Sequence, residues 1–294
     1  MPKKSGCLSG FPRRAFDLKL RGSVLKLGFE TKIMGVLNVT PDSSSDGGAY
    51  LDPGRAEERA LRMESEGAHV IDIGGESTRP GARPVTAAEE IARVRPVLKR
   101  LAKKIKVPLS IDTMRSETAH AALSEGATLI NDVSGLQFDP ALARTAARHR
   151  AGLVLMHMKG TPQTMQNDPS YKDPVREIAA FLKKTVRRAM DAGVPRAALM
   201  IDPGFGFGKT AAHNFELLAR LGEFGSLGFP LLAGLSRKSF IGSAIEAGPE
   251  GRLYGSLAAA AAAVTRGAHM LRVHDVLAHA HMARVIDRTA EAAC

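Results

Sequence analysis

The sequence lacks tryptophan, has few other aromatic residues and has only two cysteines. Aromatic residues make up 5% of its 294 residues, although 44% of the residues are hydrophobic. Small aliphatic side chains must therefore fill much of a core that is large enough for one α/β domain or two small ones. The two cysteines, Cys7 and Cys294, lie near the chain ends. This usage predicts neither a cysteine metal site nor a stabilising disulfide, and it fits a reducing compartment such as the cytoplasm.

Long apolar segments are also lacking. The small-residue run at 256–264 is too short to cross a bilayer, and no apolar run follows the basic N-terminal residues as in a signal peptide. We therefore expect a cytoplasmic protein with no membrane partner. A formal net charge of +11 favours anionic ligands. The basic clusters at 99–104 and 183–188 fit solvated helix faces, so we expect no nucleic-acid partner.

The chain instead contains a regular alternation of short apolar segments and amphipathic segments, which are typical of buried strands and helices. The expected strands are 32–37, 69–73, 107–111, 128–131, 153–156, 199–201, 230–233 and 269–273. The expected helices are 55–66, 87–103, 117–125, 140–150, 174–192, 214–221, 253–266 and 276–290. Eight such units in roughly 250 residues predict an α/β fold of the TIM (β/α)8 barrel type.

The alternative α/β architecture is a doubly wound sheet. Such a sheet usually has a G-x-G-x-x-G turn after its first strand, and segment 38–48 contains none. No linker rich in charge, proline or serine divides the chain. We therefore expect a flexible tail at 1–14 and a single domain at 15–294. Within it, segment 15–29 alternates apolar and polar residues around a glycine, which predicts a short β-hairpin.

The segment 200–210 reads MIDPGFGFGKT and combines an apolar run, an acid and a glycine-rich turn. A phosphate-binding Walker loop would need glycine where Pro203 stands, and proline has no N–H to donate. Two interpretations remain for this segment. It forms a site for a flat, hydrogen-bonding ligand beside Asp202, or a tight turn with an incidental acid.

Polar residues follow nearly every expected strand, and in a TIM barrel these strand ends form the rim that carries the chemistry. Any one of these residues has an ordinary explanation, such as a helix cap. Together on one rim they indicate a binding site. Four of them offer donors and acceptors that suit the edge of a pterin or a purine. They are Asp112, Asn131, Asp202 and Lys238.

Other rim residues suit a phosphorylated substrate. Arg272 and His274 lie two residues apart, so they share one side of their strand and suit a phosphate or diphosphate. Asn38 offers a neutral oxygen that can complete a Mg²⁺ shell made otherwise of water and phosphate oxygens. No zinc-type ligand cluster is evident from the sequence.

The motifs that carry these residues resemble those of dihydropteroate synthases, which join dihydropterin-CH₂-diphosphate to p-aminobenzoate. The motifs are MGVLNVTPDS, DIGGESTRPGA, SIDT, INDVSG, MHMKGTPQTMQ, IDPGFGFGKT, GLSRKSFIG and RVHDV. The similarity extends from about residue 32 to the end of the last expected helix. The resemblance implies a TIM barrel with the hairpin 15–29 at its bottom, a Mg²⁺ cofactor and a homodimer.

The same resemblance implies roles for individual residues. The pterin would be bound by Asp112, Asn131, Met156, Asp202 and Lys238. The diphosphate would be bound by Asn38, Thr78, Arg272 and His274, with Asn38 also on Mg²⁺. The p-aminobenzoate pocket would be formed by Thr78, Arg79, Pro80, Phe207, Lys238 and Ser239. The expected catalytic residues are Asp112, Asp46 and Lys238, with the two carboxylates stabilising the positive charge that diphosphate departure leaves on the pterin methylene.

One position departs from the family pattern. The first loop usually reads NVTPDSFSDGG, whereas this chain reads NVTPDSSSDGG, so Ser44 replaces a phenylalanine that would help cover p-aminobenzoate. We expect weaker p-aminobenzoate binding and an altered response to sulfonamides. Two other functions compete with the synthase interpretation. One is methyl transfer from methyltetrahydrofolate to a corrinoid protein, which would not need the Arg272 and His274 pair, and the other is pterin or polyanion binding without turnover.

Overall fold

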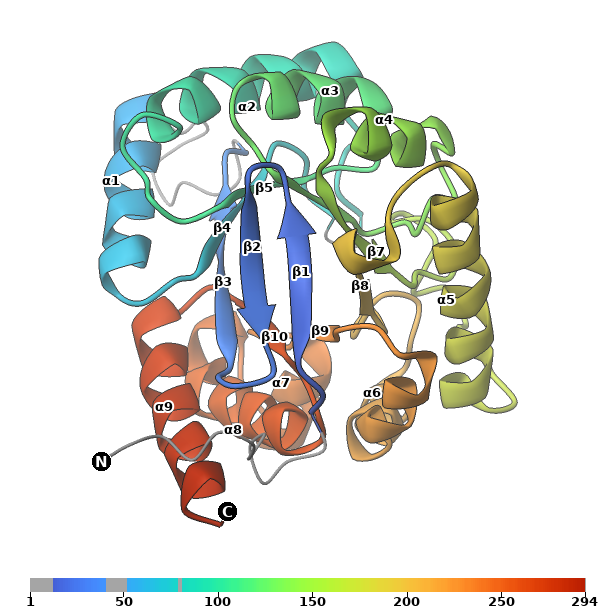
Figure 1. The fold of residues 1–294 in the computed structure, drawn as a ribbon. Helices are drawn as coiled ribbons and strands as arrows, with labels where there is room; N and C mark the ends of the chain where they lie inside the picture. The colour runs from blue at the N-terminus through green and yellow to red at the C-terminus, as the bar shows by residue number, and fades with distance from the viewer. Residues whose placement is uncertain (1–12, 41–51, 79–80, 294) are drawn as a thin grey trace.

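The computed structural model describes residues 13–40, 52–78 and 81–293 (Figure 1). Its main sheet has eight parallel strands in the order β8-β7-β6-β5-β4-β3-β10-β9. A bridge between Ile201 and Leu231, with Ile201 N donating to the Pro230 carbonyl at 3.0 Å, links the two outer strands. The sheet therefore closes into a barrel, and helices surround it (Figure 1). The TIM-barrel prediction is confirmed.

The barrel strands lie within two residues of the segments expected from the sequence. They are β3 (Lys32–Asn38), β4 (Val70–Gly74), β5 (Leu109–Asp112), β6 (Leu129–Asp132), β7 (Gly152–Met156), β8 (Leu199–Asp202), β9 (Leu232–Ala233) and β10 (Met270–Val273). Alternate residues of a strand face opposite sides of the sheet. In β3, Ile33 and Leu37 belong to the large core under the helices, whereas Met34 belongs to a separate cluster inside the barrel.

The helices that cover the barrel also follow the expected order. They are α1 (Pro53–Ser65), α2 (Ala87–Leu101), α3 (Ser116–Ser124), α4 (Ala141–His149), α5 (Pro174–Asp191), α6 (Ala211–Ala219), α7 (Ser239–Ile245), α8 (Leu253–Thr265) and α9 (Val276–Ala292). Short 3-10 turns are η2 (Arg196–Ala198), η3 (Leu221–Leu227) and η4 (Pro249–Arg252). In the described ranges, no helix is both long and apolar enough to span a membrane.

Two helix predictions were wrong in detail. The sequence predicted a single helix between the seventh and eighth strands, but α7 and η4 precede α8. Gly242 lies inside α7, where a Cβ would overlap the Arg252 side chain, and such an internal glycine obscures a helical pattern. The other helix, α6, begins at Ala211 rather than at 214, because Thr210 and His213 form a capping box that the usual Glu or Gln signature does not reveal.

The N-terminal segment forms the expected antiparallel hairpin of β1 (Phe16–Leu20) and β2 (Ser23–Leu27). Gly22 has φ +78°, a conformation that the two-residue turn requires and that glycine adopts without strain. Leu18, Leu20 and Leu27 pack against apolar side chains inside the barrel. Those partners are Met34, Val70, Leu129, Val154, Met200, Leu232 and Met270. The hairpin thus covers the end of the barrel where the strands begin, as its position across the strands in Figure 1 also shows.

The segment before the hairpin is joined to the last helix. Arg13 is buried, and its Nη2 donates to Asp287 Oδ1 of α9 at 2.7 Å. Asp287 also accepts from the Thr31 hydroxyl at 2.9 Å and from the Thr31 amide at 2.6 Å. These contacts connect the first and last described parts of the chain.

Candidate active site

A cavity of about 690 Å³ opens at the end of the barrel where the strands finish. Most of the residues singled out from the sequence line it. They are Asn38, Thr78, Asp112, Asn131, Met156, Asp202, Phe207, Lys238, Ser239, Arg272 and His274. The other singled-out positions, Ser44, Asp46, Arg79 and Pro80, lie outside the described residues. One cavity therefore brings together side chains from six of the barrel's strands and from the loops that follow β4, β8 and β9.

The centre of the cavity is a group of charged side chains inside the barrel. Arg272 Nε donates to Asp72 Oδ2 at 2.7 Å, and its Nη2 donates to Asp112 Oδ2 at 2.6 Å. Asn131 Nδ2 also donates to Asp72 Oδ2, at 2.9 Å. Burial raises the pKa of Asp112 to about 7, and the Arg272 charge opposes this shift. Asp112 therefore titrates near neutral pH instead of remaining a fixed anion.

Asp202 stands at the end of β8, where the glycine-rich turn begins. Its Oδ1 accepts a hydrogen bond from the Gly204 amide at 2.7 Å, and burial raises the pKa of Asp202 to about 6. Gly204 has φ +72°, and a Cβ at this position would overlap the His157 carbonyl. Only glycine lets the turn pass so close to the end of β7.

Lys209, which made the segment resemble a Walker loop, binds the backbone of the glycine-rich turn. Its Nζ donates to the carbonyls of Gly204 at 2.7 Å and Phe207 at 2.9 Å, and lies 3.0 Å from His157 Nδ1. Burial and the neighbouring lysine lower the pKa of His157 to about 2, so the imidazole is neutral and accepts this hydrogen bond. Because Lys209 is buried by the turn and is not among the cavity-lining residues, it holds Phe207 in place rather than a phosphate.

Lys238 provides a cationic group above an aromatic ring. Its Nζ lies 4.1 Å from the centroid of the Phe207 ring, within the range of a cation–π contact. Burial and the charge of Arg272 lower the pKa of Lys238 to about 8, while Asp202 and Asp112 oppose this shift. The side chain is therefore protonated at neutral pH but titrates only slightly above it.

His274 acts as a neutral donor rather than as a second cation. Burial, with the charges of Arg272, Arg237 and Lys238, lowers the pKa of His274 to about 3. Ser236 Oγ accepts from the His274 amide at 3.2 Å and lies 3.1 Å from His274 Nδ1. The serine hydroxyl has one O–H and two lone pairs, so it can donate to Nδ1 or accept from it, and the contact fits either tautomer of the neutral ring. A phosphate oxygen would meet an N–H at Nε2 in the tautomer that leaves Nδ1 unprotonated.

The donors around Asn38 are oxygen atoms, which suit a hard metal ion. Asn38 Oδ1 and Asp112 Oδ2 lie 3.4 and 3.7 Å from a common point beside Gly74, where a Cβ would be. Within the part of the chain that the structure describes, no three His, Cys, Asp or Glu side chains form a metal-binding group. One amide oxygen near one carboxylate suits Mg²⁺, which retains waters and takes substrate phosphate oxygens as ligands.

Several cavity residues were not identified from the sequence. They include Met165, Gln166, Glu250 and Arg252. Gln166 lies in the MHMKGTPQTMQ motif, and its Nε2 donates to the Gly206 carbonyl at 2.8 Å, so the motif was a usable signal. Arg252 belongs to η4, which the sequence did not predict, and no local pattern pointed to it.

Comparison with known proteins identifies the class first. The family described as pterin binding enzyme matches residues 34–274, which is most of the chain. The barrel and its cavity are therefore those of a pterin-binding enzyme. A dihydropteroate synthase of Synechocystis is 46% identical over 261 residues, covering 88% of this chain and 90% of the relative. That of Escherichia coli is 45% identical over 260 residues, covering 88% and 92%.

Solved structures of dihydropteroate synthases resemble this chain as well. The Yersinia pestis dihydropteroate synthase with a sulfonamide drug complex has a TM-score of 0.88 and 43% identity, covering 93% of this chain and 99% of its own. The Xanthomonas albilineans enzyme in complex with 7,8-dihydropteroate has a TM-score of 0.82 and 41% identity, covering 92% and 98%. The chain belongs to the dihydropteroate synthase family, as its motifs indicated.

Proposed function

We propose that this protein condenses (7,8-dihydropterin-6-yl)methyl diphosphate with p-aminobenzoate to give 7,8-dihydropteroate and diphosphate, a transferase reaction (EC 2.5.1.15) of folate biosynthesis. The observation that carries the proposal is the single cavity lined by every described residue to which the family resemblance gave a role. The complexes of the Xanthomonas albilineans relatives with 4-aminobenzoic acid and with 7,8-dihydropteroate support the same substrates.

The pterin ring is bound in the depth of the barrel. Asp202 and Asn131 are buried there and offer acceptors and an amide donor to the heterocycle edge, and Met156 offers an apolar surface beside them. Asp112 adds a carboxylate whose pKa of about 7 lets it exchange a proton with its surroundings at neutral pH. Such an acceptor-rich, buried ring of side chains selects a flat ligand with several N–H groups, because unpaired buried acceptors are costly.

The diphosphate is bound nearer the mouth. Arg272 is engaged by Asp72 and Asp112, and its remaining N–H groups can donate to phosphate oxygens. His274, in its Nε2–H tautomer, would add a neutral donor, and Thr78 and Asn38 add polar groups from the adjacent loops. A Mg²⁺ ion held by Asn38, water and the diphosphate would neutralise the leaving group's charge.

The bond to the diphosphate breaks when its charge is neutralised by these donors. Positive charge then develops on the pterin methylene, and the Asp112 carboxylate stabilises it. We also assign this role to Asp46, which lies outside the described residues. The neutral amine of p-aminobenzoate attacks the methylene carbon and loses a proton, so the chemistry requires no covalent bond to the protein. Asp112 in its anionic form and Lys238 in its protonated form are the states that this step needs.

The second substrate lies between the glycine-rich turn and the loop after β9. Phe207 presents its ring there with Lys238 above it, and Ser239 is exposed at the start of α7. An aromatic amine fits beside the ring, with its carboxylate toward Lys238 and Ser239, and we add Thr78, Arg79 and Pro80 from the loop after β4. A sulfonamide has the same aniline and a comparable acidic end, so it would occupy the same pocket.

We further propose that the protein is a cytoplasmic homodimer. The helix α8 is built from small residues and Tyr254 at its start is 82% exposed, which supports close packing against a second copy on this side of the barrel. Light scattering of the purified protein would measure the mass directly, and a mass of one chain across the working concentration range would exclude the dimer.

The experiment that tests the proposed reaction measures diphosphate release from the pterin substrate with Mg²⁺, with and without p-aminobenzoate, and follows dihydropteroate at the same time. We expect dihydropteroate and diphosphate to form in equal amounts. Tight pterin binding without release of diphosphate by the folded protein would contradict the proposal and favour a binding protein, whereas methyl transfer from methyltetrahydrofolate would favour the corrinoid-linked alternative.

A further inference from the structure

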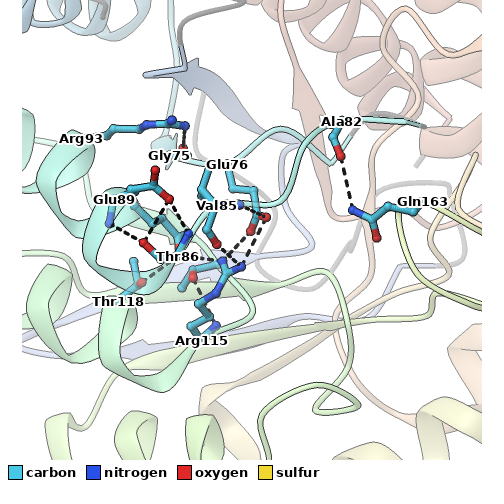
Figure 2. Close-up of polar contacts among 12 residues, drawn as sticks. Gly75, Glu76, Ala82, Val85, Thr86, Glu89, Arg93, Arg115, Thr118 and Gln163 are labelled. Atoms are coloured by element: carbon cyan, nitrogen blue, oxygen red, sulfur yellow. Dashed lines mark hydrogen bonds and ion pairs between the residues drawn. The ribbon is translucent and has the colours of Figure 1, made fainter.

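One arginine outside the cavity fastens both ends of the loop that joins β4 to α2. Arg115 precedes α3, and its guanidinium forms an ion pair with Glu76 at the start of this loop. Its Nη2 donates to the Val85 carbonyl at the end of the loop, at 2.7 Å. The Val85 amide in turn donates to Glu76 Oε1 at 3.2 Å, which closes the ring of contacts (Figure 2).

The guanidinium is itself held from the side opposite the loop. Arg115 Nη1 donates to Glu90 Oε2 of α2 at 3.0 Å, and the Thr118 hydroxyl of α3 donates to the same oxygen at 2.7 Å. The Arg115 amide donates to the Thr113 hydroxyl at 3.2 Å, directly after Asp112. Glu90 is completely buried, so its carboxylate depends on these partners. Arg115 therefore has a fixed position between α2, α3 and the end of β5.

The loop that Arg115 fastens reaches the cavity, although Arg115 does not. Glu76, Ser77 and Thr78 line the cavity, and Arg115 is not among the lining residues. On its outer side the described part of the loop is also held by Arg93, whose Nη1 donates to the Gly75 carbonyl at 2.8 Å, and by Gln163, whose Nε2 donates to the Ala82 carbonyl at 3.3 Å (Figure 2). Arg115 and the direct hydrogen bond from the Val85 amide to Glu76 together join the two ends of the loop to each other.

We propose that Arg115 is a positioning residue that sets the width of this loop and thereby the place of Thr78 at the p-aminobenzoate side of the cavity. The inference rests on the proposed function. A planar guanidinium can bind a carboxylate through two N–H groups and a carbonyl through a third, which an ammonium group cannot do with the same geometry. Small displacements of substrate-positioning groups lower activity strongly, so the fastening has a kinetic consequence.

The test compares three variants with a matched control. Arg115→Lys retains a charge beside Glu90. The double variant Arg115→Gln with Glu90→Gln removes the guanidinium without leaving a buried carboxylate unpaired. The control is Arg95→Gln, because Arg95 Nε binds Glu125 Oε1 at 2.6 Å and so also joins α2 to the end of α3, but far from the loop. Arg115→Gln alone completes the series.

Steady-state kinetics provide the first measurement. We expect the KM for p-aminobenzoate to rise about tenfold to a hundredfold in Arg115→Gln and the double variant, less in Arg115→Lys, and not in the control. The KM for the pterin substrate should rise less, because Thr78 is only one of several groups at its diphosphate and the contacts to the pterin ring come from other strands. An unchanged KM for p-aminobenzoate in a folded variant, or an equal rise for both substrates, would overturn the proposal.

Hydrogen exchange of the ligand-free protein provides the second measurement, and it does not depend on turnover. We expect the amides of residues 76–78, 81–83 and 85 to exchange faster in the double variant than in the wild type or in Arg95→Gln. Equal exchange rates in all of these proteins would refute the fastening role. A wild type that forms no dihydropteroate would instead contradict the proposed function, and the exchange rates would still decide the role of Arg115.

Discussion

The two ends of the barrel are built from the same strands and have opposite character. At the end where the strands begin, Met34 and Met270 pack under a hairpin in an apolar cluster. At the other end of the same two strands, Asn38 and Arg272 face a polar cavity. The covered end stabilises the fold by removing apolar surface from water, whereas the open end contains buried charges that oppose folding.

The covered end of the barrel therefore contributes mainly to stability, and the open end mainly to catalysis. Three groups of the open end have pKa values moved toward neutrality, namely Asp112, Asp202 and Lys238, and burial is the main cause in each. The buried side chains of the cluster under the hairpin are those of leucine, methionine and valine. Substitutions at the two ends should therefore have distinct signatures, and each of the following experiments tests that separation.

The largest effect is expected from Arg272→Met. This change leaves Asp72 and Asp112 without their counterion, and removing one partner of a buried ion pair costs about 3–5 kcal/mol. Turnover should fall by about 10²–10³-fold as well, because the diphosphate loses a donor. Urea unfolding and product formation measure the two effects.

The control for this variant is Arg220→Gln. Arg220 forms ion pairs with Asp173, Glu216 and Glu223 on the surface, where solvent screening makes such pairs contribute little to stability. An equal loss of stability in the two variants would show that burial of charge does not distinguish the open end.

Leu27→Ala, at the covered end, should lower stability without changing the kinetic constants. Leu27 is completely buried in the hairpin cluster, so the cavity created should lower the free energy of unfolding by about 2–5 kcal/mol. The kinetic constants of the folded fraction should be unchanged, since the residue does not line the site. Val24→Ala, on the same strand but 52% exposed, should change stability by less than about 0.5 kcal/mol. A changed substrate KM in Leu27→Ala would show that the covered end also affects the active site.

The pH dependence of kcat/KM for the pterin substrate should form a bell. Activity falls below about pH 7 as Asp112 takes up a proton, and it falls above about pH 8 as Lys238 loses one. In Asp112→Asn the acidic limb should move to about pH 6, where Asp202 titrates. If the acidic fall in kcat/KM stays at about pH 7 in Asp112→Asn, a group other than Asp112 causes it.

The raised pKa of Asp112 also predicts how the stability of the protein should change with pH. The folded-state pKa of Asp112 lies above the ordinary value of 3.8, so folding favours the protonated acid. The resulting stabilisation is complete below about pH 4 and is lost as the pH rises through about 7. Thermal unfolding of the wild type and of Asp112→Asn across this window would measure it, and identical curves would contradict the assignment.

The smallest effect is expected from Ser44→Phe, at a position outside the described residues. An added aromatic contact with p-aminobenzoate contributes about 0.5–1.5 kcal/mol, which corresponds to a decrease in KM of about two- to tenfold. Sulfonamide inhibition should change in the same sense. Unchanged values for both p-aminobenzoate and the drug would show that this position does not cover the ring.

The barrel and most of the cavity could be predicted from the sequence because their signals are local. A strand end is recognised where an apolar run meets a polar residue, and Asp112, Asn131 and Asp202 each stand at such a point. The fold then brings these ends to one rim without further information. The helix at 239–245 escaped prediction because it is short and contains Gly242, which accommodates the Arg252 side chain.

Contacts between distant segments had no such signal. The pairing of Arg115 with Glu76 and Glu90 joins residues 39 and 25 positions apart, and that of Arg272 with Asp72 joins residues 200 apart. Each of these arginines looks like an ordinary charged residue in its own segment. The charge state of His274 was also beyond the sequence, because it depends on the cations that the fold collects around the ring.

The contact between Arg13 and Asp287 has a consequence for how the protein is made. The two residues are 274 positions apart, and the guanidinium has no exposure in the folded chain. During synthesis the first residues leave the ribosome long before the last helix exists, so Arg13 must wait in water until its partner emerges. The Arg13–Asp287 ion pair can therefore form only after α9 has been synthesised, and chains that end before Asp287 lack it.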